Sequence, residues 1–237
     1  MIIINGKVTG QINSNGRVIT NNHEETKTVD ITKTELAYST LNLSISSQLA
    51  NVNISTWDND NVQARLHGNI SKEQNISLNI SKAYKNIKIS VDVNSFSNSF
   101  CMVNNLELDI QVPLKLFEEV IIKSNNGNIS LKSLNASVVD ASCTNGNISC
   151  CVLPKHLSLS SNNGNLQLNA KAVQDSVLDL NSKNGNISAK LNNISHSTVD
   201  VFSKNGNHTM SCSHSKAGLY AISGNVSTKN GNVSFEY

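Results

Sequence analysis

The second half of the chain alternates apolar and polar residues around recurring Asn-Gly-Asn triplets. After each glycine, apolar side chains stand two and four residues on in most repeats, with a polar residue between them, as in Ile187-Ser188-Ala189. Further apolar pairs, such as Leu178 and Leu180, precede the glycine by seven and five residues. Alternation with a period of two is typical of a β-strand with one buried face. Each repeat therefore predicts one strand before its glycine and one strand after it.

The glycines of these triplets recur at a regular distance. From Gly127 to Gly206, successive glycines are 19, 18, 21 and 21 residues apart. A period near 20 residues indicates one structural unit per repeat, stacked on its neighbours. We expect a turn at each of these glycines, with a positive φ that glycine adopts without steric cost. The predicted turn glycines are Gly127, Gly146, Gly164, Gly185, Gly206 and Gly231.

Two arrangements agree with this pattern. Asn-Gly is a strong signal for a two-residue hairpin, so a meander of antiparallel hairpins is one alternative. The repeats also place a small residue three positions before the glycine and asparagines on both sides of it. Such equivalent residues form side-chain ladders when they stack about 4.8 Å apart. The pattern therefore favours a parallel solenoid with one coil per repeat, in which Ile148, Leu166 and Ile187 lie on consecutive coils.

The first half of the chain is strand-rich but irregular. Short alternating segments run from Leu41 to Val112, with polar breaks between them, and no convincing amphipathic helix is present. The predicted fold is all-β, with an irregular β-rich half over residues 1–112 and a regular β-solenoid over residues 113–237. Pro113 marks the join between the halves, which we expect to form one continuous domain.

The order of these features resembles a known group of bacterial proteins. An irregular strand-rich half is followed by the segment Leu108 to Pro113 and then by repeated Ser-x-Asn-Gly-Asn-Ile units. This resembles the bacterial "putative adhesin" families of unknown function, some of which are likened to autotransporter adhesin heads. The resemblance extends from about Leu41 onward. It implies a right-handed, parallel β-helix-like fold in cell-envelope or stress-linked proteins, and it supplies no catalytic residues.

Composition narrows the choice of function and location. Aromatic residues make up only 4% of the chain and charged residues 15%, which suits a narrow aliphatic interior. The net charge is +2 and there is no basic run, so no nucleic-acid partner is expected. No stretch is long enough to span a membrane, and the apolar run at the start is too short for a signal peptide. We expect a bacterial cell-envelope or surface location if a leader or anchor has been removed, and a cytoplasmic location otherwise.

The cysteines form a poor framework for disulfides, because they are odd in number and irregularly spaced. This usage suits a reducing compartment or an anaerobic source. The five are Cys101, Cys143, Cys150, Cys151 and Cys212.

Acidic residues of the repeats are the best candidates for catalysis. Asp140, Asp179 and Asp200 each stand six residues before their glycine, on the predicted outer face. On adjacent coils, Asp179 and Asp200 would repel each other across about 5 Å, and Lys183 and Lys204 could relieve that repulsion. Some β-helix enzymes cleave polysaccharides with clustered carboxylates, but exposed charges are usually only solvated. No catalytic residue is assigned.

Metal sites are weakly supported. Asp58 and Asp60 beside Trp57 form an ordinary turn, and the neutral asparagines of the repeat turns are poor calcium ligands. Cys212 and His214, with His208 nearby, match no standard zinc spacing. No metal and no cofactor is assigned.

These observations favour a non-enzymatic, adhesin-like binding or spacing module. Its polar faces would present hydroxyl and amide groups to a protein or glycan partner. The first alternative is an intracellular or envelope-stress regulatory partner protein, which the free cysteines favour. The second alternative is a carbohydrate-active β-helix enzyme.

Overall fold

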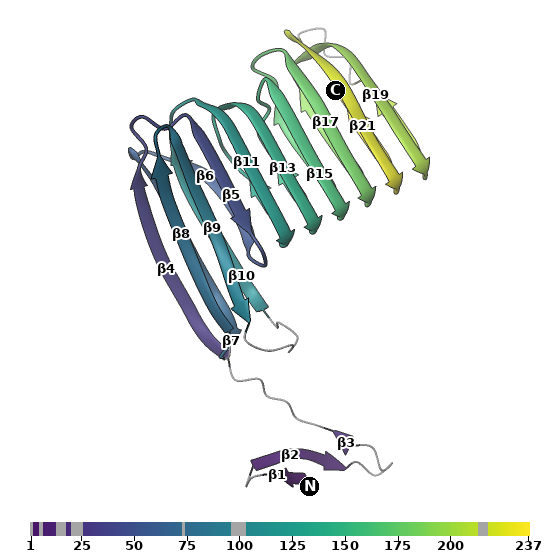
Figure 1. The fold of residues 1–237 in the computed structure, drawn as a ribbon. Coiled ribbons are helices and arrows are strands. Elements are labelled where there is room, and N and C mark those ends of the chain that lie inside the picture. The colour runs from purple at the N-terminus through teal and green to yellow at the C-terminus, as the bar shows by residue number, and fades with distance from the viewer. Residues whose placement is uncertain are drawn as a thin grey trace.

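The protein is built from strands and turns. The computed structural model describes residues 2–4, 7–12, 18–19, 26–72, 74–95, 103–212 and 218–237, and these ranges contain no helix (Figure 1). Accordingly, no helix able to span a membrane occurs in them. Three short strands form a separate antiparallel sheet, and they are β1 (Ile2–Ile4), β2 (Lys7–Ile12) and β3 (Val18–Ile19).

The irregular half contributes one end of two larger sheets. In it, β4, β7 and β10 pair antiparallel, as do β8 and β9, whereas β6 pairs parallel to β10 and β5 parallel to β9. This mixture of parallel and antiparallel pairing removes any simple repeat. The strands are β4 (Thr26–Leu36), β5 (Asn42–Ser47), β6 (Asn51–Trp57), β7 (Asn61–Ser71), β8 (Gln74–Ala83), β9 (Asn86–Ser95) and β10 (Val103–Pro113).

The regular half continues both sheets with one coil per repeat. The longer strand of each coil joins a nine-stranded sheet, and the shorter strand after the glycine joins a ten-stranded sheet. The longer strands are β11 (Phe117–Asn126), β13 (Ala136–Asn145), β15 (His156–Asn163), β17 (Ser176–Asn184), β19 (Ile194–Asn205) and β21 (Tyr220–Asn230). The shorter strands are β12 (Ile129–Leu131), β14 (Ile148–Cys150), β16 (Leu166–Lys171), β18 (Ile187–Asn192), β20 (His208–Ser211) and β22 (Val233–Glu236).

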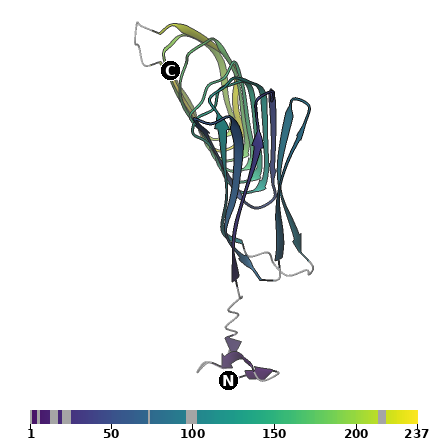
Figure 2. The same ribbon diagram turned by 90° about the vertical axis from the view of Figure 1, so that its left-hand side faces the viewer.

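Each Asn-Gly corner carries the chain from one sheet to the other. Thus β11 pairs in parallel with β13, and β12 pairs in parallel with β14. A hairpin would instead pair β11 with β12, so the hairpin alternative is wrong. Figure 2, which looks along the stack of coils, shows that they follow one another around a common interior. The all-β prediction with parallel sheets is confirmed.

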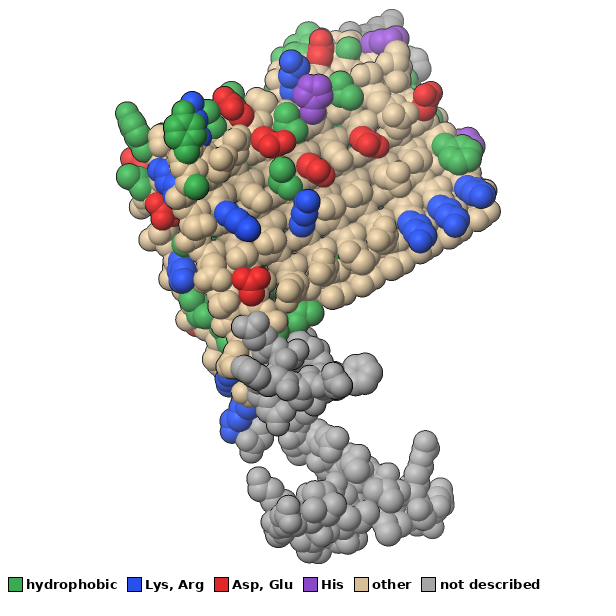
Figure 3. All heavy atoms as spheres, viewed as in Figure 1, with side chains coloured by type: hydrophobic (Ala, Val, Ile, Leu, Met, Phe, Trp, Pro, Cys, Tyr) green, Lys and Arg blue, Asp and Glu red, His purple; other side chains and the backbone are tan. Residues whose placement is uncertain are grey.

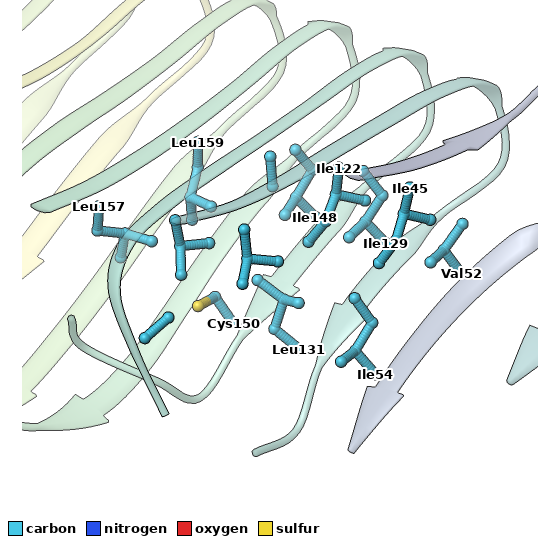
Figure 4. Packing of buried hydrophobic residues seen from close by; sticks show 14 of the residues in the cluster. Ile45, Val52, Ile54, Ile122, Ile129, Leu131, Ile148, Cys150, Leu157 and Leu159 are labelled. Atoms are coloured by element: carbon cyan, nitrogen blue, oxygen red, sulfur yellow. The ribbon is translucent and has the colours of Figure 1, made fainter. Parts of the chain in front are cut away.

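The core is a stack of aliphatic side chains between the two sheets. Ile148 pairs with Leu166, and Leu166 pairs with Ile187 on the next strand. All three are at most 1% exposed, and Figure 4 shows how such side chains from successive coils meet in the interior. The predicted stacking of these residues is confirmed. The polar residue that follows each of them, namely Ser149, Gln167 or Ser188, faces outward, because successive side chains of a strand point to opposite faces.

Side-chain ladders hold the corners together. The asparagine before each corner glycine except Gly127 donates its Nδ2 to the Oδ1 of the equivalent asparagine one coil away, over 2.6 to 2.8 Å, and the ladder runs from Asn126 through to Asn205. Buried hydroxyl groups form a second ladder: Ser161 donates to the carbonyl of Gly146, and Ser182 to that of Gly164. These bonds explain why the small residue and the asparagines recur.

The reason for glycine at the corners differs from the predicted one. Among the described glycines, positive φ occurs only at Gly68, Gly224 and Gly231, so the expected positive φ is wrong for the other five corner glycines. Space is the constraint instead. A Cβ on Gly164 would lie 1.9 Å from the carbonyl oxygen of Gly146, because the corners stack backbone on backbone.

The coils do not stack in sequence order at the far end. Strand β21 lies between β17 and β19, and β22 lies between β18 and β20. The inserted coil carries Val233 and Phe235 in the core, both at most 2% exposed. At the equivalent positions the outermost coil carries His208 and Met210, which are exposed. The more apolar coil therefore occupies the covered position, where burial stabilises it more.

Candidate functional site

The acids of the repeats do not form the stacked pair that the sequence suggested. Because β21 is inserted, Asn225 lies between Asp179 and Asp200 in the register. Ser158 likewise separates Asp140 from Asp179. The acids therefore stand two strands apart, about 10 Å at the usual strand spacing, and the predicted close repulsion is wrong.

The lysines expected to balance these acids do not form ion pairs with them. Lys183 and Lys204 form no ion pair with any residue that the structure describes, so their predicted role beside Asp179 and Asp200 is wrong. Figure 3 shows acidic side chains scattered over the outer face of the nine-stranded sheet, with basic side chains both within this face and in a row at its edge.

The weak metal candidates are also dispersed. Asp58 and Asp60 lie in a surface turn beside Lys115, and His208 lies on β20 at the edge of the ten-stranded sheet. His214 and Cys101 lie outside the described residues. No group of three potential metal ligands occurs within the described part of the chain.

A polar hollow on the outer face of the ten-stranded sheet is the best candidate site. It arises in the irregular half, where outward side chains of four neighbouring strands or strand ends converge. Strand register places Asp109 of β10 between Asn53 of β6 and Arg65 of β7. The hollow has a volume of about 380 Å³, and its lining is Asn53, Ile54, Ser55, Gln63, Arg65, Asp109, Gln111 and Lys132.

A hydrogen-bond network fixes one side of this hollow. Asn53 donates to Asp109 over 2.9 Å and also to Glu107 over 2.9 Å. The Nε2 atom of His67 lies 2.8 Å from the second oxygen of Asp109. Asn53 and Asp109 each have two hydrogen-bond partners, and the His67 ring is held by Asp109. The wall that these three side chains form is therefore preorganised.

Arg65 is fixed separately, from the adjacent edge strand. Its Nε and one terminal nitrogen donate to the two carboxylate oxygens of Asp30 on β4, over 2.9 and 2.8 Å. This two-point contact holds the guanidinium plane against the sheet. The hydrogen bond from Arg65 lowers the pKa of Asp30 below its ordinary value.

The protonation of Asp109 follows from the same network. Partial burial favours its neutral form, but the hydrogen bonds with Asn53 and His67, together with the charges of His67 and Lys132, outweigh burial and lower the pKa of Asp109. A general acid for glycoside cleavage needs a raised pKa, so that it holds its proton near neutral pH. The charged Asp109 is therefore suited to accepting hydrogen bonds and unsuited to donating a proton.

Three lining side chains remain available to a ligand. Gln63, Gln111 and Lys132 form no side-chain hydrogen bond or ion pair with any described residue, although they border the hollow. Each of the two amides offers an acceptor oxygen and a donor nitrogen, and the ammonium group adds further donors. The site thus combines a fixed polar wall with free polar groups, which is the arrangement needed to bind a small polar ligand.

No local sequence pattern indicates this site. The residues that form it are far apart in the sequence: Asp109 is 42 residues from His67 and 56 residues from Asn53. Gln63, Arg65 and His67 occupy alternate positions and so share one face of a strand. From the sequence alone, such alternation indicates only that this face is exposed. Arg65 is also one of just two arginines in the chain.

Two sheets joined by repeated corners, with a rigid polar hollow on one face, define a strand-rich scaffold of the β-solenoid kind. The chain belongs to the Toastrack DUF4097 family, whose sequence profile matches residues 40–236. No curated protein matches the sequence.

The fold is shared with a solved structure. The chain is similar to the crystal structure of a "putative cell adhesion protein" from Clostridium sporogenes, with 13% identity and a TM-score of 0.53. That match covers 89% of this chain and 99% of the other. It is also similar to a "putative adhesin" from Bacteroides fragilis, with 11% identity and a TM-score of 0.49, covering 88% of this chain and 97% of the other.

Proposed function

We propose that this protein is a non-enzymatic, adhesin-like binding module that takes a glycan in the hollow around Asp109. The observation that carries the proposal is the pairing of a fixed polar wall with the free amides of Gln63 and Gln111. Sugars present many hydroxyl groups that both donate and accept, which planar amide and carboxylate groups can satisfy. Lys132 and Arg65 add donors at the rim of the hollow.

The test compares two double variants on the same sheet. Gln63→Ala with Gln111→Ala removes free amides from the hollow, while Gln167→Ala with Asn169→Ala removes amides from β16, outside it. Two lost hydrogen bonds are worth about 2 kcal/mol, which is roughly a thirtyfold loss of affinity. We expect this loss only for the first variant, measured calorimetrically on a glycan selected from a neutral glycan array.

Two results would overturn the proposal. One is equal binding by parent and hollow variant, which would place any glycan elsewhere. The other is conversion of the bound glycan to products, followed by chromatography, which would favour the carbohydrate-active enzyme. General acid–base groups contribute about 10²–10⁴-fold to the rate, so replacing the responsible Glu or Asp would then lower turnover by that factor.

The location at a bacterial cell envelope is part of the same proposal. It carries over the description of the Clostridium sporogenes protein as a "putative cell adhesion protein". Cys151 has an exposed thiol, whereas Cys150 beside it is buried. Labelling of Cys151 in intact cells by a maleimide that cannot cross membranes would support the surface location. Labelling only after lysis would favour the intracellular regulatory partner.

The finer architecture is proposed on the same basis. We take the coils to wind right-handed, and residues 1–112 and 113–237 to form one continuous domain, because both larger sheets run through both halves. The expected observation is one cooperative unfolding transition reported equally by Trp57 fluorescence and by circular dichroism. Two separate transitions would divide the chain.

A further inference from the structure

Three lysines form a row across the outermost coils of the nine-stranded sheet. Lys183, Lys229 and Lys204 each stand two residues before a corner glycine, on β17, β21 and β19. The in-register pairing of the flanking residues on these strands aligns the three. Neighbouring strands lie about 4.8 Å apart, so three ammonium-bearing side chains leave the sheet at that spacing. Figure 3 shows this row of lysine side chains at the edge of the face. We call it the lysine ladder.

The charge of the lysine ladder is not balanced by its surroundings. None of the three lysines forms an ion pair with any described residue. Asp179 and Asp200, the acids on the same strands, stand four residues earlier, about 13 Å along a strand. That exceeds the Debye length of about 8 Å at physiological salt. Like charges directly opposite each other destabilise a sheet, so a bound anion would relieve a repulsion that the fold itself leaves in place.

The fold does not require lysine at this position. The three preceding coils have neutral residues there, namely Asn125, Thr144 and Asn162, and their corners form the same hydrogen bonds. The lysine ladder is therefore an added feature of the outer coils rather than part of the repeat.

An exposed aromatic ring adjoins the lysine ladder. Phe202 lies two residues before Lys204 on β19, on the same outward face, and is 57% exposed. Its partner on the neighbouring strand is Ser227, a small residue. The Phe202 ring therefore offers an exposed apolar surface directly beside the three ammonium groups.

We propose that the lysine ladder and Phe202 bind a linear polysaccharide that carries a carboxylate on every sugar. An extended chain of this kind advances by about one pyranose ring per coil of about 4.8 Å, so its carboxylates come within reach of the flexible lysine side chains. The apolar face of one sugar ring packs on Phe202. A single-stranded nucleic acid fits less well, because such ligands need a series of aromatic rings for successive bases. Along the described lysine ladder there is one ring.

This site goes beyond the proposed glycan site in the hollow. The hollow lies on the ten-stranded sheet and the lysine ladder on the nine-stranded sheet, so variants of one leave the other intact. Neutral glycans test the hollow, and acidic polymers test the lysine ladder. Each proposal can therefore fail while the other stands.

The experiment measures binding of polygalacturonate, with neutral dextran as the comparison polymer. The test variant changes Lys183, Lys204 and Lys229 to Gln. The matched control changes three scattered exposed lysines, Lys33, Lys88 and Lys171, to Gln and so removes the same net charge. One lysine near an anionic surface contributes about a fivefold gain in affinity, so the test variant should lose roughly 100-fold. The control should lose less than about fivefold, the contribution of one lysine.

Further readouts separate the parts of the proposal. Arg at the three ladder positions should retain binding, because the charge is kept, and Phe202→Ala should weaken binding of polygalacturonate at constant charge. Thermal unfolding of each variant verifies that the fold is intact. Equal losses in the test variant and the scattered control would overturn the proposal, because net charge alone would then explain binding. Tighter binding of a single-stranded oligodeoxynucleotide than of polygalacturonate would also overturn it, in favour of a nucleic-acid partner.

Discussion

Replacing the corner glycine Gly164 by alanine gives the sharpest test of how the coils are held together. Its added Cβ would lie 1.9 Å from the carbonyl oxygen of Gly146 and 2.5 Å from the carbonyl carbon. Contacts closer than 3.0 Å are essentially never seen for a Cβ, so the two corners must separate by about 1 Å. The neighbouring atoms are backbone and cannot rotate away.

The cost follows from the hydrogen bonds that such a separation breaks. Three of the hydrogen bonds that join this corner to the Gly146 corner involve Gly146 or the asparagine before each glycine: Gly146 N–H to the carbonyl of Asn163, Ser161 Oγ to the carbonyl of Gly146, and Asn163 Nδ2 to Asn145 Oδ1. At about 1 kcal/mol each, Gly164→Ala should lower the free energy of unfolding by about 3 kcal/mol. That is a large fraction of the 5–15 kcal/mol that stabilises a typical domain.

The assay is urea unfolding followed by circular dichroism, with Gly206→Ala as the matched comparison. Its Cβ would lie 2.0 Å from the carbonyl oxygen of Gly231, an equally severe contact. Gly206 belongs to the outermost coil, however, which can move outward because neither β19 nor β20 has a further described neighbour. We expect it to cost less than half as much as Gly164→Ala. Equal losses, or a loss at Gly164 below about 0.5 kcal/mol, would refute steric stacking as the reason for glycine.

Three further predictions concern the core, the candidate site and the cysteines. Ile187→Ala should cost about 2–5 kcal/mol in urea unfolding and Ser188→Ala less than about 0.5, and similar losses would contradict their opposite orientations. The folded state lowers the pKa of Asp109, so its stabilising contribution is present above the unfolded value near 3.9 and is lost as pH falls. The stability difference between the parent and Asp109→Asn should thus shrink on acidification, and a constant difference from pH 7 to 3 would contradict this. Burial raises the pKa of Cys150 to about 12, so at pH 8 it should react with iodoacetamide far more slowly than exposed Cys151, and equal rates by mass spectrometry would argue against the packing.

The strands of the repeats could be predicted because their signal is local. Alternation around Ile187 requires only that one face be buried, and the same alternation recurs in every coil. The order of the coils could not be predicted in this way, since any coil offers its neighbour the same asparagines and the same glycine. The two outer coils differ in their core positions, where Val233 and Phe235 stand in the covered coil and His208 and Met210 in the outermost one.

The candidate site depends on contacts that no local pattern contains. Asp109 meets Asn53 through a parallel pairing and Arg65 through an antiparallel one, and neither pairing follows from spacing along the chain. The pKa of Asp109 depends on the same contacts. The predicted reason for glycine at position 164, a positive φ, is wrong on similar grounds. The atom that obstructs a Cβ at Gly164 belongs to another coil.

The inserted coil has a consequence for biosynthesis. Asn205 and its ladder partner Asn230 are 25 residues apart, so the ribosome needs about 1–5 s to add the second after the first. During that interval the open edge of β17 can pair with β19, whose corner offers the same asparagine. A nascent protein that formed this pair would have to release it before residues 220–236 could take their place between β17 and β19.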